Sequence, residues 1–209
     1  MSQAIDQALR LSELVSARLS HELVGAAGAI SNGLELMEEL GADAGPDVTQ
    51  LVSESAANLK ARLQFYRMAY GRSGRESAGL PELRALTVGF FDHIDGVTLD
   101  WPMAPIVPTL EGGEGKLILS LAALAADALP RGGTVRISLE DAQFAARVTG
   151  TDAGLRSDVE AAMDASVAME SLSPRTVHAF LAAALAQEAG RSVRVVREDA
   201  ETITLIAAR

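Results

Sequence analysis

The chain has 209 residues, enough for one large domain or two small ones, and its formal net charge is −10 at pH 7. The absence of cysteine excludes disulfides and thiolate metal sites, three histidines leave little for a histidine metal cage, and the acidic balance argues against nucleic-acid binding. The longest uncharged stretches, 23–34 and 176–187, are shorter than the roughly 20 apolar residues of a membrane span, so we expect a cytoplasmic protein that contacts neither membrane nor nucleic acid.

Two regions of different character predict two domains, with boundaries at 1–72 and 80–209. The first region contains a single proline and has a helical pattern throughout, whereas the second mixes helical and strand patterns. Between them, residues 71–81 (GRSGRESAGLP) contain three glycines and a proline, which is typical of a linker.

The first region predicts a helical hairpin. Apolar residues recur alternately four and three positions apart before a break at 41–46, which is the heptad spacing of bundle packing. We expect helices that end near residue 40 and begin near residue 47, antiparallel because their connection is short. Two helices alone bury too little surface, so a homodimer that completes a four-helix bundle is the simplest partner arrangement. The apolar positions are Leu19, Leu23, Ala26, Ile30, Gly33, Met37 and Leu40, then Leu51, Val52, Leu59, Leu63, Tyr66 and Tyr70.

The second region predicts an α+β fold with one antiparallel sheet covered by helices on one face. A serine followed by proline at 173–174 indicates a helix start, because Ser favours the cap and Pro the first turn. The expected helices are 81–91, 116–129, 157–163 and 173–190, and the expected strands are 97–101, 134–139, 144–148, 192–197 and 202–207.

His21 is the candidate nucleophile of the first helix. If Leu19 and Leu23 occupy the buried d and a positions, His21 occupies f, the most exposed heptad position. An imidazole held outward on a rigid bundle is a usable nucleophile. The spacing alone also fits an incidental polar residue, because an f position tolerates any of them.

A basic stretch lies on the second helix. From residue 55 to residue 75 there is no acidic side chain, and five cations are present. In a hairpin that turns near residue 44, Arg67 lies beside His21, and Arg18 lies one turn before it. Such a cationic surround suits a phosphorylated imidazole or an acidic partner. The alternative is an ordinary solvated face that balances nearby acids such as Glu13.

The segment around His21 resembles the H-box of sensor histidine kinases, whose dimerisation domain is a helical hairpin with an exposed histidine. The residues of this match are Ser20, His21, Glu22 and Leu23, followed by Ala29 and Ile30. The second region resembles the ATP-binding domain of the same kinases. Residues 116–141 resemble the asparagine-box helix with its following turn and strand, 148–155 the first glycine box, and 181–195 the helix and strand after the second glycine box.

The departures from the kinase pattern fall on the nucleotide-binding positions. Ser120 and Leu124 stand where the kinases have asparagines that hold Mg²⁺ and nucleotide, and leucine cannot coordinate a hard cation. Gly150 replaces the adenine-reading Asp, and Asp152 stands where a glycine is expected. The second glycine box (169–180, MESLSPRTVHAF) contains no glycine. We therefore expect no ATP binding, no cofactor and no metal site.

A histidine-kinase-like dimer with a degenerate ATPase domain resembles the ChpT-type histidine phosphotransferases, which shuttle a phosphoryl group between receiver-domain aspartates. The resemblance implies an α+β chain: an N-terminal hairpin forming a dimeric four-helix bundle, then a degenerate ATPase-like α/β sandwich. It implies His21 as the phosphoryl carrier and Glu22 near its Nδ1 atom. The basic surround described above then gives Arg18 and Arg67 as the expected partner-binding residues. The implied partners are response-regulator receiver domains, including that of a hybrid histidine kinase, with Mg²⁺ bound to the receiver. Gly25 stands where phosphatase-active kinases have Thr or Asn, which favours retention of the phosphoryl group.

Two other functions remain open at this point. The chain could be an active sensor-type histidine kinase with a divergent ATP site, which would require nucleotide affinity. It could also be a non-catalytic dimeric interaction module in which His21 is incidental.

Overall fold

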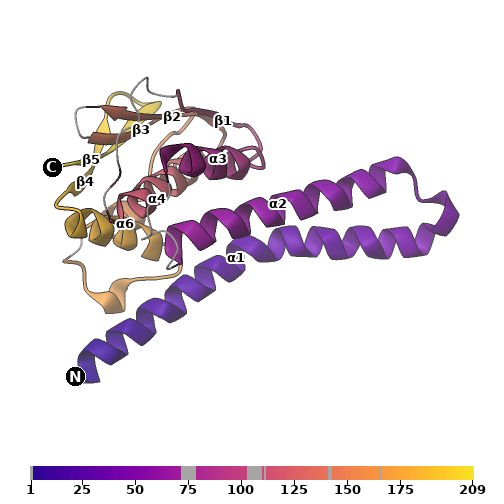
Figure 1. The fold of residues 1–209 in the computed structure, drawn as a ribbon, viewed down its shortest axis with the longest axis horizontal. Coiled ribbons are helices and arrows are strands. Elements are labelled where there is room, and N and C mark those ends of the chain that lie inside the picture. Colours follow the sequence, from indigo (N-terminus) through magenta and orange to yellow (C-terminus); the bar gives the residue numbers. More distant parts are fainter. Residues whose placement is uncertain (1, 72–78, 103–109, 111, 141–142, 165) are drawn as a thin grey trace.

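The computed structural model describes residues 2–71, 79–102, 110, 112–140, 143–164 and 166–209. Its N-terminal part is a hairpin of two long helices, α1 (Ser2–Leu40) and α2 (Pro46–Tyr70), joined through the short 3-10 helix η1 (Gly41–Asp43). Figure 1 shows this hairpin projecting as a long arm from the rest of the molecule. The predicted helix ends near 40 and 47 are confirmed, and most of the predicted linker, 72–78, lies outside the described residues.

Close packing between the two helices depends on a glycine. Gly33 is buried, and a Cβ atom at this position would collide with Cγ2 of Val52, so only glycine permits this approach without rearrangement. Between residues 24 and 63 of the hairpin, six large apolar side chains remain 38–66% exposed. They are Val24, Leu34, Leu36, Leu40, Leu51 and Leu63.

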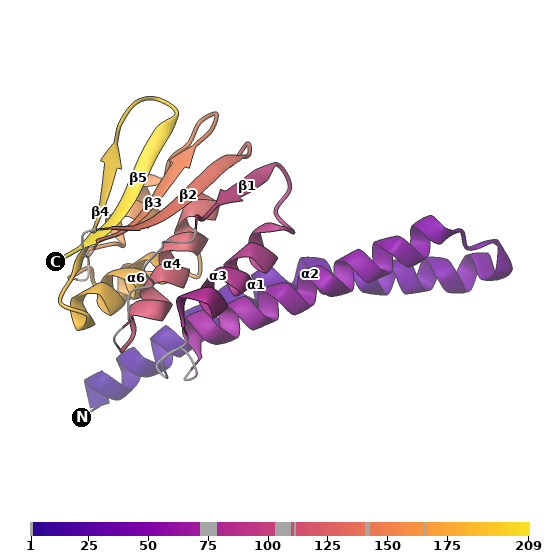
Figure 2. The ribbon, with the colours of Figure 1, turned by 45° about the horizontal axis from the view of Figure 1, so that its top comes forward.

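The α+β region packs helices against one face of a five-stranded sheet (Figure 2). The strands are β1 (Val97–Asp100), β2 (Gly133–Glu140), β3 (Gln143–Thr149), β4 (Ser192–Arg197) and β5 (Thr202–Ala208), in the order β1-β2-β3-β5-β4. The helices are α3 (Leu80–Phe91), α4 (Glu114–Asp127), α5 (Ser157–Ala161), the 3-10 helix η3 (Met169–Ser171) and α6 (Val177–Glu188).

The predicted all-antiparallel sheet is wrong at one edge, because β1 pairs with β2 in parallel. A parallel pair needs a crossover connection, and the chain between these strands includes α4. The other three strand pairs are antiparallel, as predicted.

The start of α6 also differs from the prediction. The helix begins at Val177, and Ser173 to Thr176 form a hydrogen-bonded turn before it. The Ser173 amide donates to Oγ1 of Thr176 at 3.0 Å, and the Val177 amide donates to the Ser173 carbonyl at 3.0 Å. Pro174 and Arg175 therefore lie on an ordered, exposed turn and not on a helix.

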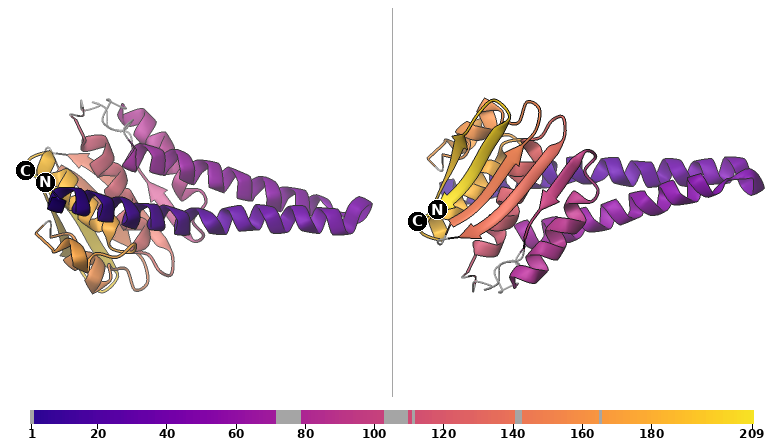
Figure 3. Two further views of the ribbon diagram at one scale, coloured as in Figure 1. Left: turned by 90° about the horizontal axis from the view of Figure 1, so that it is seen from below. Right: turned by 90° about the horizontal axis from the view of Figure 1, so that it is seen from above.

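The base of the hairpin is packed into the core of the α+β region. Phe65 of α2 is fully buried and stacks on Phe90 of α3, with ring centroids 4.2 Å apart and an interplanar angle of 16°. Figure 3 shows, from below, the N-terminal half of α1 running across the helical side of this region. The hairpin is therefore held against the α+β region by aromatic burial.

One carboxylate also connects three helices. Asp127, the last residue of α4, has its Oδ2 atom 2.8 Å from Nη2 of Arg18 on α1 and 3.0 Å from Nε2 of the buried His178 on α6. Removal from bulk water raises the pKa of the Asp127 carboxyl, but His178 and Arg18 lower it by more, so the net pKa is below its ordinary value. We call Arg18, Asp127 and His178 the interdomain junction.

Asp127→Asn is expected to loosen the interdomain junction, because a neutral amide cannot replace the carboxylate between two basic groups. We expect a loss of about 1–3 kcal/mol in the free energy of unfolding and faster amide exchange in α1 around Arg18. Since folding lowers the pKa of Asp127, this contribution is present above the ordinary carboxyl pKa and is lost as the pH falls through the folded value.

The matched control is Asp100→Asn on β1, whose partner Arg136 forms an exposed ion pair on the sheet. Such pairs are worth about 0–1 kcal/mol. Equal, small effects of the two substitutions on stability and exchange would contradict a special role for Asp127.

Candidate functional site

His21 lies exposed on α1, as the heptad pattern predicts. Leu19 and Leu23, two residues to either side, are half-buried. The helix therefore turns these two side chains inward and presents the imidazole to solvent, where an incoming electrophile can reach it.

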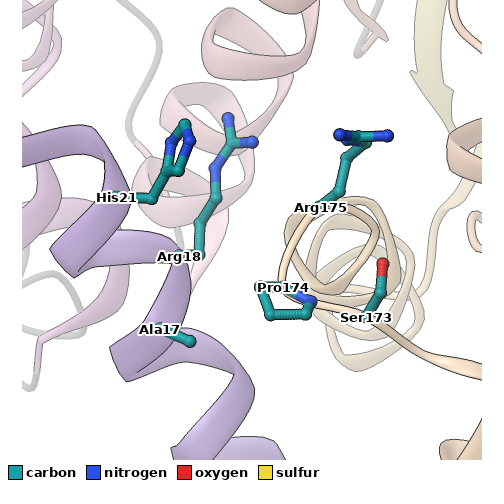
Figure 4. Close-up of a pocket in the computed structure, with 6 residues that line it drawn as sticks. All are labelled: Ala17, Arg18, His21, Ser173, Pro174 and Arg175. Atoms are coloured by element: carbon teal, nitrogen blue, oxygen red, sulfur yellow. The ribbon is translucent and has the colours of Figure 1, made fainter.

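A cleft of about 450 Å³ lies next to His21. One wall is α1, with Ala17, Arg18 and His21, and the other wall is the turn before α6, with Ser173, Pro174 and Arg175. Figure 4 shows the side chains of His21, Arg18 and Arg175 projecting to the same side of this cleft. The site thus combines residues more than 150 positions apart in the sequence.

Glu22 is oriented by three neighbours. Its Oε2 atom accepts hydrogen bonds from Nη1 of Arg62 at 3.0 Å and from the Tyr66 hydroxyl at 3.1 Å, and its Oε1 atom lies 3.2 Å from Nη2 of Arg18. Burial and the Glu22 charge raise the pKa of Tyr66 above its ordinary range, so the phenol remains a donor. The structure thereby directs Glu22 towards α2, and its expected place near Nδ1 of His21 stays a prediction.

Three arginines at this level of the hairpin differ in their surroundings. The Arg18 side chain is 13% exposed and contacts two carboxylates, those of Asp127 and Glu22. On α2, Arg62 forms the ion pair with Glu22, whereas Arg67 is exposed and is not among the residues that line the cleft. The predicted partner-binding pair is therefore not brought together in the cleft, and only Arg18 lies there.

Arg175 is the functional candidate that the sequence did not reveal. It is exposed, and within the described residues its guanidinium has neither a hydrogen bond nor an ion pair. It lies in the degenerate second glycine box, and its chain position gives no indication that the turn faces His21. A cation without a bound carboxylate makes this wall of the cleft attractive to anions.

The positions that match nucleotide-binding residues are used for packing. Ser120 and Leu124 of α4 are both 0% exposed. At Gly150, a Cβ atom would collide with the Gly132 carbonyl, so this glycine permits two backbone segments to approach. Asp152 has a left-handed backbone (φ 58°) and forms an exposed ion pair with Arg131.

The part of the chain that the structure describes has neither a cluster of metal ligands nor a membrane-spanning helix. There, no three His, Asp or Glu side chains are grouped as metal ligands. Within the same residues, no helix has both the length and the apolar character required to cross a bilayer.

Comparison with known proteins agrees with this architecture. A family model described as the histidine phosphotransferase C-terminal domain matches residues 80–201. The protein phosphotransferase ChpT of Brucella abortus (strain 2308) is 31% identical over 196 residues, covering 90% of this chain and 90% of that protein. A solved structure described as a bacterial phosphotransferase is 30% identical, with a TM-score of 0.81 over 96% of each chain.

These matches cover the hairpin as well as the α+β region, and they confirm the resemblance to the ChpT-type histidine phosphotransferases. The chain belongs to the histidine phosphotransferase family.

Proposed function

We propose that this protein passes a phosphoryl group between the aspartates of response-regulator receiver domains, with His21 as the intermediate carrier. The observation that supports this most directly is the exposed His21 imidazole at the edge of a cleft that also holds Arg175, which has no carboxylate partner among the described residues. The chain belongs to the histidine phosphotransferase family. Receiver domains of hybrid histidine kinases are among the proposed donors.

The proposed reaction is an in-line transfer. The Nε2 lone pair of neutral His21 attacks the phosphorus of a receiver acyl phosphate, a P–N bond forms, and the P–O bond to the receiver aspartate breaks. The electron pair leaves with the aspartate carboxylate. The Nδ1 proton stays on the ring, which becomes a phosphorylated imidazolium until that proton is lost. The reverse sequence delivers the group to a second receiver, and each receiver supplies its own Mg²⁺.

We also propose that the α+β region has no ATP-dependent kinase activity. The burial of Leu124 and Ser120 supports this, because neither side chain can coordinate Mg²⁺ from inside the core. An active kinase with a divergent ATP site would require an accessible coordinating oxygen or nitrogen there, whereas the Ser120 hydroxyl is buried and Leu124 has no polar atom.

We propose that a second copy of the chain packs against the exposed apolar side chains of the hairpin. Between residues 24 and 63, the six exposed large apolar side chains of α1 and α2 make an unusually apolar surface for a free helical hairpin. A dimeric four-helix bundle would bury such a surface and repeat the phosphotransfer site twice.

His21→Gln is expected to fold normally, because an exposed side chain contributes little to packing, and to accept no phosphoryl group. Incubation with a phosphorylated receiver domain, followed by detection of acid-labile phosphate, measures this. The control is His93→Gln in the turn after α3. Labelling of His21→Gln at the wild-type rate would contradict the assignment.

Glu22→Gln is expected to slow transfer without weakening receiver binding, because a neutral amide stabilises the imidazolium less. Charge partners of this kind are worth about 10²–10⁴-fold in rate. Rapid-quench measurement at saturating phospho-receiver separates the transfer rate from binding. The control Arg62→Gln removes the main ion-pair partner of Glu22 but keeps the carboxylate. Equal slowing by both would show that Glu22 acts only by holding the hairpin together.

Leu51→Glu is expected to convert the dimer to a monomer, because the dimer would have to bury an unpaired carboxylate. Light scattering at micromolar concentration measures the mass. The matched control Ser53→Glu places the same charge at an exposed polar position of α2. A wild-type protein that is monomeric under these conditions would contradict the proposed dimer.

A further inference from the structure

We propose that Arg175 is a catalytic residue that binds the phosphoryl oxygens during transfer at His21, so that the hairpin and the α+β region share one active site. This proposal rests on the proposed function only in taking His21 as the carrier. It gives the degenerate second glycine box a new role, which is to stabilise a transferring phosphoryl group.

The placement of Arg175 is the first argument. It lies on the wall opposite His21 in a cleft of about 450 Å³, and both side chains project to the same side (Figure 4). A guanidinium donates two parallel N–H groups, which match the spacing of phosphate oxygens. A phosphoryl group on His21 would therefore face the guanidinium of Arg175 across the cleft, which could donate two hydrogen bonds to its oxygens.

The charge balance is the second argument. Arg18, the other guanidinium in the cleft, already contacts the carboxylates of Asp127 at 2.8 Å and Glu22 at 3.2 Å. A cation between two carboxylates has little capacity left for a dianionic phosphoryl group. Arg175 has no carboxylate partner among the described residues, so it is the cation that the cleft offers to an anion.

The support of Arg175 is the third argument. The turn from Ser173 to Thr176 is closed by backbone and side-chain hydrogen bonds between its two ends, and Pro174 fixes one backbone angle within it. Three residues after Arg175, His178 lies 3.0 Å from the Asp127 carboxylate that also binds Arg18. The interdomain junction therefore connects both walls of the cleft and sets the distance between them.

The chemistry requires such a group. In the transition state of phosphoryl transfer, negative charge is spread over three oxygens that belong to neither the entering nor the leaving group. A guanidinium at those oxygens stabilises the same transition state in both directions. Loss of Arg175 should therefore slow both the loading of His21 and its unloading.

The test uses phosphoramidate, a small donor that cannot dock as a receiver does. In this reaction a P–Nε2 bond to His21 forms while the P–N bond of phosphoramidate, whose nitrogen is already protonated, breaks. Neutral ammonia leaves with the electron pair and then takes up a proton from the solvent. We expect Arg175→Ala to lower the labelling rate of His21 by on the order of 10²-fold, as for other single oxyanion donors, and Arg175→Lys to restore part of it. The matched control Arg136→Ala removes an exposed arginine of the sheet and should label at the wild-type rate.

Three other results would overturn the catalytic role of Arg175. If Arg175→Ala reacts with phosphoramidate like wild type but slowly with phospho-receiver, Arg175 serves docking only and the catalytic role is overturned. If it reacts normally with both donors, the role is overturned while His21 stands as the carrier. If wild-type His21 is labelled by neither donor, the proposed function and this inference are both overturned.

Discussion

The Asp127 carboxylate at the end of α4 determines how the rest of the structure is arranged. It lies 2.8 Å from the Arg18 guanidinium and 3.0 Å from the His178 imidazole, and both neighbours lower its pKa. A charged carboxylate close to both basic groups favours this placement of α1 relative to α4 and α6, because moving either helix away would separate the carboxylate from a basic side chain. Stacking of Phe65 on Phe90 supplies apolar contact at the same junction. Arg18 is one turn from His21, so the junction that holds the two regions together also shapes the cleft beside the histidine.

In the α+β region, the positions that match the nucleotide-binding residues of the histidine kinases are used for packing. Leu124 and Ser120 lie on α4 and are buried in the core, and Gly150 lets two turns approach closely. The turn at Ser173 to Thr176, which corresponds to the second glycine box, is rigid and positions an arginine at the cleft. In this account the region no longer brings a phosphoryl donor to the histidine. Its contribution is one wall of a site at which an external donor and acceptor exchange the group.

Features that depend on local sequence were predictable. The heptad spacing predicted the hairpin and the exposure of His21, and alternation predicted all five strands within two residues at either end. Features that depend on contacts between distant segments were not. Tertiary packing decides the parallel pairing of β1 with β2, the partners of Glu22 and the approach of Arg175 to His21. Hydrophobic periodicity predicts single helices and strands and carries no information on such contacts. The late start of α6 has a local cause, because the Ser173 and Thr176 side chains satisfy the turn without a helix.

The most direct test of the account follows labelled phosphate between two receiver domains in the absence of nucleotide. One receiver is loaded with radiolabelled phosphate, separated from its kinase and mixed with this protein and a second, unlabelled receiver. The account predicts that label reaches the second receiver only when this protein is present, through an intermediate that is labile in acid and stable in base. Label that remains on the first receiver, or that reaches this protein only when ATP is added, would contradict it.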